Sequence, residues 1–178
     1  MGDWQLDPYH TQVEFSAKHL GMMTVRGHFA DVTSTADIDP DHPETMRVEV
    51  TIQAASIQTH HAVRDKDLRS SNFLDTDAFP VITFTTTEVE PAGEDNYAVT
   101  GDLTIKGNTR PVTLQMTRLG EFNDPAMGHR IGYNGHTAIN RRDFGLTFSP
   151  VLDGRLVVSD DINIMLEGEL VEQAPATT

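Results

Sequence analysis

The chain has 178 residues, no cysteine and an excess of acidic side chains that gives a formal net charge of −14. The lack of cysteine excludes disulfides, thiolate metal sites and cysteine nucleophiles. The charge argues against non-specific binding of nucleic acid, which needs a basic surface, and an anionic membrane surface is expected to repel such a protein.

The N-terminal segment, residues 1–7, has neither the basic stretch nor the apolar run of a signal peptide. No apolar run approaches the roughly 20 residues that a transmembrane helix needs, so we expect no integral membrane segment. We therefore expect a cytoplasmic protein, or a periplasmic or secreted one if a leader has been removed.

Alternation of apolar and polar side chains is the dominant pattern along the chain. It first shows in Val13, Phe15 and Ala17, whose neighbours are polar. It recurs over residues 46–54, 97–106, 112–116, 131–139 and 162–170. A period of two predicts strands that have one buried and one solvent-facing side.

Turn residues separate these runs. Lys106-Gly107-Asn108-Thr109 predicts a tight hairpin, and Asp153-Gly154 predicts a further turn. Loops rich in proline, glycine and acidic residues are expected at residues 39–43 and 91–96. About eight strands result, at the spacing typical of a barrel or a sandwich.

One stretch departs from the alternation. Helical spacing, at intervals of four, three and four, connects Ile57, His61, Arg64 and Leu68. We predict a helix over residues 57–70 with Ser56 as its N-cap. Pro80 then ends a tight link, because proline does not continue a helix.

Four segments of the chain, taken together, carry a family resemblance. They are Phe15–Gly21 with Val25–Phe29, Arg64–Leu68 with Ser71–Asp75 and Phe79–Phe84, Gly101–Gly107, and Arg142–Leu146. In order and spacing they resemble the YceI-like family of polyisoprenoid-binding proteins. The resemblance implies an all-β fold: an antiparallel eight-stranded lipocalin-like β-barrel with one helix inserted between strands.

The resemblance extends over nearly the whole chain, and no internal repeat or linker interrupts it. We expect a single YceI-like barrel domain over residues 1–172 and a flexible tail at residues 173–178. The family resemblance also implies a homodimer. Outward-facing apolar residues expected to supply its interface are Val81, Leu119, Met165 and Val171.

The implied function is non-catalytic binding, transport or storage of a long polyisoprenoid or similar apolar lipid, such as a quinone tail, fatty acid or fatty amide. Burial contributes about 0.8 kcal/mol per methylene-sized group. Ten or more such groups offset an association cost of about 4–15 kcal/mol. No cofactor is expected beside the lipid. The predicted ligand contacts are Phe15, Phe29, Val48, Val50, Leu68, Phe73, Phe84, Leu103, Ile105, Tyr133, Ile139, Phe144, Ile164 and Leu166.

Charged residues leave an alternative function open. The most suggestive are Lys18, His19, Arg64, Asp65, Arg142 and Asp143. If at least two of Lys18, His19, Arg64 and Asp65 converge inside the cavity, the protein is better explained as a small enzyme or isomerase acting on a lipid-like substrate. We favour ion pairs that tie turns to strands, and hence no catalytic residues. An interaction module, the third hypothesis, predicts a large exposed apolar patch and no cavity.

Histidines raise the question of a metal. His60 and His61 are adjacent, and adjacent residues of a helix point about 100° apart, so they chelate poorly together with His10, His19 or His28. The His-Glu-x-x-His signature of zinc enzymes is absent. We predict no metal site.

Overall fold

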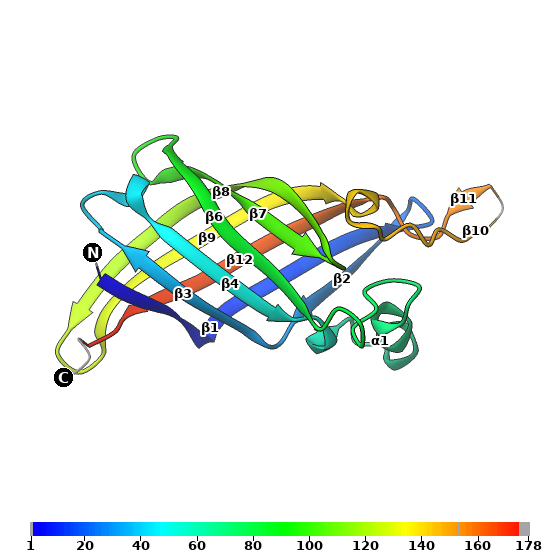
Figure 1. Cartoon of the computed structure of the whole chain (residues 1–178), viewed down its shortest axis with the longest axis horizontal. Coiled ribbons are helices and arrows are strands. Elements are labelled where there is room, and N and C mark those ends of the chain that lie inside the picture. The colour runs from blue at the N-terminus through cyan, green and yellow to red at the C-terminus, as the bar shows by residue number, and fades with distance from the viewer. Residues whose placement is uncertain (1, 153, 175–178) are drawn as a thin grey trace.

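The computed structural model describes residues 2–152 and 154–174, and more than half of these lie in strands (Figure 1). Eight strands form the wall of a barrel. They are β1 (Gly2–His19), β3 (Val32–Ile38), β4 (Arg47–Gln53), β6 (Val81–Pro91), β7 (Asn96–Ile105), β8 (Asn108–Asp124), β9 (Gly128–Asn140) and β12 (Asp161–Glu172).

The barrel closes between its first and last strands. Its order is β12-β9-β8-β7-β6-β4-β3-β1, every pair is antiparallel, and β1 pairs with β12. Because β1 pairs with β12, neither end of this eight-strand order is left as an open edge. The predicted eight-stranded antiparallel barrel with one helix is confirmed for the described residues.

Strand β1 is long enough to have two successive partners on one side. Its start pairs with β3, as in Trp4 with Ala36, and its end pairs with β2 (Met23–Phe29), as in Phe15 with Gly27. The two-residue strand β5 (Ile57–Gln58) adds to β2. At this end β5 and β6 do not pair, and the helical segment lies beside them (Figure 1).

The helix is shorter than predicted. It is α1 (Ala62–Arg69), capped by His61, whose Nδ1 accepts a hydrogen bond from the Arg64 amide at 3.2 Å. Ile57 instead pairs with Phe29 in β5, a pairing that suits a β-branched residue. Ser56 is therefore not the N-cap: its hydroxyl donates to the Gln53 carbonyl at 2.7 Å within a short 3₁₀ turn, η2 (Ala54–Ser56).

The predicted hairpin between β7 and β8 is present. Lys106 and Gly107 both have positive φ angles, 49° and 74°, as a two-residue type I′ turn requires. A Cβ on Gly107 would lie 2.9 Å from Cε1 of Phe79. Glycine therefore permits both the turn and the close approach of the link that follows α1.

The remaining elements are short and irregular. They are η1 (Pro43–Thr45), η3 (Arg141–Phe144) and the hairpin of β10 (Val151–Leu152) and β11 (Arg155–Leu156). The β10–β11 hairpin projects from the end of the barrel where α1 lies, which we call the α1 end, and the start of β1 and the end of β12 lie at the other, far end (Figure 1). The predicted turn at Asp153-Gly154 falls in this hairpin, with Asp153 outside the described residues.

Two apolar clusters fill the barrel wall. One, at the far end, includes Trp4, Ile38 and Ile131, and the other, toward α1, includes Ile57 and Ile82. In the part of the tail that the structure describes, the Gln173 amide donates to the Asp3 carbonyl at 2.8 Å, and residues 175–178 lie outside that part. The described residues contain no helix long and apolar enough to cross a membrane.

Candidate functional site

A cavity of about 1060 Å³ occupies the barrel interior. All eight wall strands contribute lining residues, and so do α1 and the segment after β9. The volume is at the upper end of the range usual for small-ligand pockets, about 300–1,000 Å³. The barrel is thus hollow. Alternation in the sequence does not show this, because a hollow barrel and a packed one produce the same pattern.

Most of the predicted ligand contacts face this cavity. The thirteen that line it are Phe15, Phe29, Val48, Val50, Leu68, Phe73, Phe84, Leu103, Ile105, Tyr133, Ile139, Ile164 and Leu166. Phe144 does not line it: the side chain is 2% exposed and packs inside the apolar cluster near α1. Contact with a ligand stays a prediction for the thirteen.

Glycines on neighbouring strands explain how large side chains line the cavity without filling it. Phe15 lies against Gly27, and Phe84 lies against Gly101, so that a Cβ at either glycine would collide with the ring. Because each ring occupies the space that a side chain would take on the next strand, it lies along the wall. The centre of the barrel stays open.

The charged residues at the α1 end pair with nearby hydroxyls and backbone. The Lys18 ammonium donates to Thr24 Oγ1 at 2.8 Å. Arg64 Nε donates to Thr59 Oγ1 and its Nη2 to the Thr59 carbonyl, both at 2.8 Å. The Thr59 amide in turn donates to the buried Asp65 carboxylate at 2.9 Å. Lys18, His19 and Arg64 border the cavity, and Lys18 and Arg64 make their hydrogen bonds with different partners, Thr24 and Thr59.

Arg141 is a cavity-lining residue that the sequence prediction missed. It is 2% exposed, and its guanidinium donates to the carbonyls of Leu146, Phe148 and Ser159 at 2.6, 2.8 and 3.0 Å. Burial lowers the pKa of Arg141, and the Asp160 carboxylate at 3.3 Å opposes that shift. The side chain lines the cavity and holds the loop beside its opening.

Strand parity would have identified this residue. In β9 the side chains of Ile131, Tyr133 and Ile139 point inward, so the same parity places Arg141 inside and Arg142 outside. In agreement, the Arg142 Nε donates to the Asp160 carboxylate at 2.8 Å on the exposed side of the loop. Asp143 is also exposed.

The far end of the cavity holds a buried phenol. Tyr133 lines the cavity, and desolvation by burial raises its pKa to about 12. At neutral pH the phenol is therefore uncharged, which is compatible with an apolar ligand beside it.

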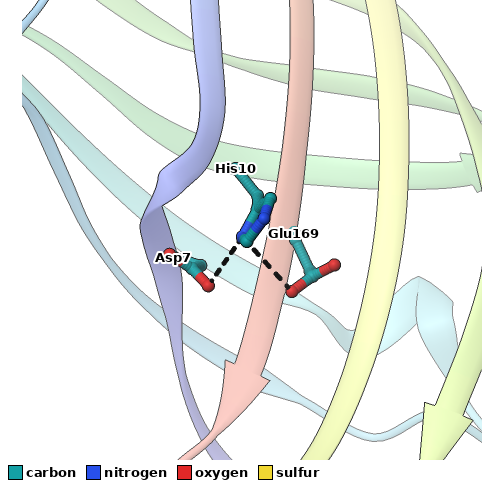
Figure 2. Close-up of side chains that lie close together, drawn as sticks. All are labelled: Asp7, His10 and Glu169. Carbon is teal, nitrogen blue, oxygen red and sulfur yellow. Dashed lines mark hydrogen bonds and ion pairs between the residues drawn. The ribbon is translucent and has the colours of Figure 1, made fainter.

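Outside the barrel wall, Asp7, His10 and Glu169 lie close together where β1 bulges away from β12 (Figure 2). His10 Nδ1 is 3.0 Å from Asp7 Oδ2 and 4.0 Å from Glu169 Oε1. The Arg130 guanidinium pairs with both carboxylates, at 2.9 Å from Asp7. Hydrogen bonding from His10 is the largest cause that lowers the pKa of Asp7 to about 2, with help from the Tyr9 amide and Arg130. Since the Arg130 guanidinium already pairs with both carboxylates, we assign the group to an ion-pair network that fastens the bulge.

An antiparallel eight-stranded barrel around an apolar cavity defines a class of proteins that hold a small ligand inside, as lipocalins do. The model of the YceI-like domain matches residues 4–170 of this chain. The chain belongs to the YceI-like family, as its sequence motifs predicted.

Curated relatives agree with this assignment. A UPF0312 protein of Pseudomonas paraeruginosa is 40% identical over 146 residues, which cover 81% of this chain and 76% of the relative. A UPF0312 protein of Pseudomonas fluorescens is 41% identical over 141 residues, which cover 76% of this chain and 71% of the relative.

Solved structures show the same fold. The Campylobacter jejuni YceI protein superposes with a TM-score of 0.76 at 29% identity, over 88% of this chain and 90% of that one. BcnA of Burkholderia cenocepacia has a TM-score of 0.78 at 23% identity, over 92% and 98% of the two chains. A polyisoprenoid binding domain from Saccharophagus degradans has a TM-score of 0.71 at 16% identity, over 97% and 100%.

Proposed function

We propose that this protein binds one long apolar lipid, a polyisoprenoid or a molecule of similar shape, inside the barrel and acts as a non-catalytic carrier or store. The observation that carries the proposal is the cavity of about 1060 Å³, lined predominantly by aliphatic and aromatic side chains from every wall strand. The description of the Saccharophagus degradans neighbour as a polyisoprenoid binding domain supports the choice of ligand.

The energetics of the cavity support a ligand without a charged anchor. Each buried methylene-sized group contributes about 0.8 kcal/mol, so a chain of some tens of carbons offsets the cost of its lost freedom. Tyr133 offers an uncharged hydroxyl-bearing ring at the far end of the cavity, and burial holds its pKa near 12. Shape and exclusion of water are thus sufficient for affinity.

A catalytic function is the weaker alternative. It requires titratable groups that converge inside the cavity, whereas Lys18 pairs with Thr24 and Arg64 pairs with Thr59 at the α1 end. Asp65 is buried against Thr59 and is not among the residues that line the cavity. Structural pairing therefore accounts for these charges.

A pair of tryptophan substitutions tests the proposal. Val50→Trp places a large ring in the cavity, and Met165→Trp places the same ring on the outer face of β12, where Met165 is 49% exposed. We expect Val50→Trp to lower the lipid recovered by solvent extraction at least fivefold and Met165→Trp to leave it unchanged. Circular dichroism checks that both variants remain barrels. Equal lipid content in the wild type and in folded Val50→Trp would contradict binding inside the barrel.

A further inference from the structure

Apolar side chains are exposed around the opening of the cavity. We define the rim as Met22, Met23, Val63, Phe148, Val151 and Leu152, which are between 40% and 74% exposed. They come from three segments at the α1 end: the β1–β2 turn, the first turn of α1, and the loop that carries β10 (Figure 1). Val63 and Phe148 also line the cavity, so the rim is continuous with its apolar wall.

Specific contacts hold these three segments together. The Leu20 amide donates to the Val157 carbonyl at 3.2 Å, which joins the β1–β2 turn to the base of the β10–β11 hairpin. The rings of Phe73 and Phe148 meet edge to face with centroids 5.4 Å apart, which joins the link after α1 to the same loop. The rim is therefore a fixed feature of one end of the barrel.

The net charge of the protein is not spread evenly along the barrel. We count as the α1 end its loops and turns, which comprise residues 18–24, 59–80, 105–109, 141–152 and 154–161. They carry seven basic and seven acidic residues. Arg155 is left out of this count because its side chain is not described. The far end carries three basic and fifteen acidic residues; it comprises residues 2–7, 37–47, 88–96, 118–130 and 167–174. Most of the negative charge thus lies away from the rim.

Basic side chains predominate at the opening itself. Lys18, Arg64 and Lys66 border the cavity there, and Asp67 is the acidic residue of α1 that borders it with them. Asp67 accepts a hydrogen bond from the Asn72 side-chain amide at 3.0 Å, whereas the Lys66 side chain is exposed. The opening therefore presents apolar groups together with positive charge, the combination that favours an anionic lipid surface.

Distance separates this end from the acidic one. Strand β8 has 17 residues, which span about 56 Å along the strand at about 3.3 Å per residue. At a tilt of about 40° this corresponds to roughly 40 Å along the barrel axis. The Debye length in physiological salt is about 8 Å, so the far end exerts little repulsion on a surface that touches the rim. The repulsion expected from the net charge alone therefore does not apply at this end.

We infer that the α1 end docks on an anionic phospholipid bilayer, with the rim in the interfacial region and the cavity opening facing the lipids. The inference rests on the proposed function, because an apolar ligand would then pass between bilayer and barrel without crossing water. Lys18 and Lys66 contact lipid phosphates, and Met22, Met23 and Leu152 enter the acyl boundary. The acidic far end stays in solvent.

Vesicle flotation tests the docking. The probes are vesicles of phosphatidylcholine alone and vesicles of equal parts phosphatidylcholine and phosphatidylglycerol. The rim variant combines Met22→Ser, Met23→Ser and Leu152→Ser. The matched control combines Leu119→Ser, Phe122→Ser and Met127→Ser, three residues that are similarly exposed at the far end. A charge variant combines Lys18→Gln and Lys66→Gln.

We expect the wild type and the far-end control to float with the mixed vesicles. The rim variant should bind them at least tenfold more weakly, and the charge variant at least threefold more weakly. Failure of the wild type to float with mixed vesicles, or an equal loss in the far-end control, would overturn the docking.

Solvent extraction of the same preparations separates this inference from the proposed function. Extractable lipid in a wild-type protein that does not float overturns the docking alone. A wild-type protein without extractable lipid overturns the proposed function, and that result is obtained without vesicles.

Discussion

At the residue scale, the single tryptophan of the chain reports on a titrating neighbour. Trp4 is 1% exposed, and its ring meets that of His129 edge to face with centroids 4.8 Å apart. Burial alone would lower the pKa of His129, but hydrogen bonds with Glu121 and Glu172 outweigh it and raise the pKa above the usual 6.5. The imidazolium therefore persists beside Trp4 to a higher pH than that of an ordinary histidine.

This pair yields a pH prediction. A protonated imidazole quenches indole emission, so Trp4 fluorescence should rise as pH increases through a midpoint above 6.5, and His129→Gln should abolish the step. Because the folded pKa is raised, the stabilisation from His129 is complete below pH 6.5 and is lost as pH rises through the folded value. His129→Gln should then cost about 1 kcal/mol in urea unfolding on the acidic side and less on the alkaline side. A fluorescence midpoint below 6.5 would contradict the assigned hydrogen bonds.

Arg141 offers a second test at this scale. Arg141→Met leaves the carbonyls of Leu146 and Phe148 without their donor, so we expect a loss of about 3 kcal/mol in unfolding free energy. Hydrogen exchange in residues 145–152 should accelerate as well. Arg142→Met is the control, because that side chain is 41% exposed and should change stability by no more than about 0.5 kcal/mol. Equal effects of the two substitutions would refute the parity that places Arg141 inside.

At the scale of elements, two glycines of the barrel wall differ in what a Cβ atom would collide with: backbone at one position, and mainly a flexible side chain at the other. A Cβ at Gly101 would lie 2.6 Å from the Thr85 carbonyl oxygen as well as against the Phe84 ring. A Cβ at Gly135 would meet chiefly the flexible end of Met116, with the nearest backbone oxygen at 3.2 Å. We expect Gly101→Ala to cost about 3 kcal/mol by overpacking and Gly135→Ala less than about 1 kcal/mol, as measured by thermal unfolding. The reverse order would contradict this account of the hollow wall.

Alternation predicted the elements well because one face of each wall strand is buried. The inward parity of Val48, Ile105 and Ile164 was readable from sequence, and so was the Lys106-Gly107 turn. The start of α1 was not, because Ile57 fits both a helical period and the strand pairing with Phe29 that it makes. The period of two did not apply to Phe144, because it is the last residue of η3, four residues beyond the end of β9, whereas Arg141 directly follows β9.

At the scale of the whole molecule, the predicted dimer patch does not form one face. Val81 lies on β6 and Met165 on β12, and three strands separate β6 from β12 in either direction around the barrel. A homodimer therefore needs a different surface from the four residues predicted to supply it. Dimer formation and the cytoplasmic location both stay predictions.

Native mass spectrometry of the wild-type protein, purified without detergent, shows directly whether the barrel holds a lipid. We expect a mass above that of the 19.7 kDa chain, with the excess released on denaturation as an apolar lipid. The same spectrum reports whether the chain is a dimer. A wild-type protein that carries no added mass, and gains none after incubation with long isoprenoids, would contradict lipid binding in the barrel.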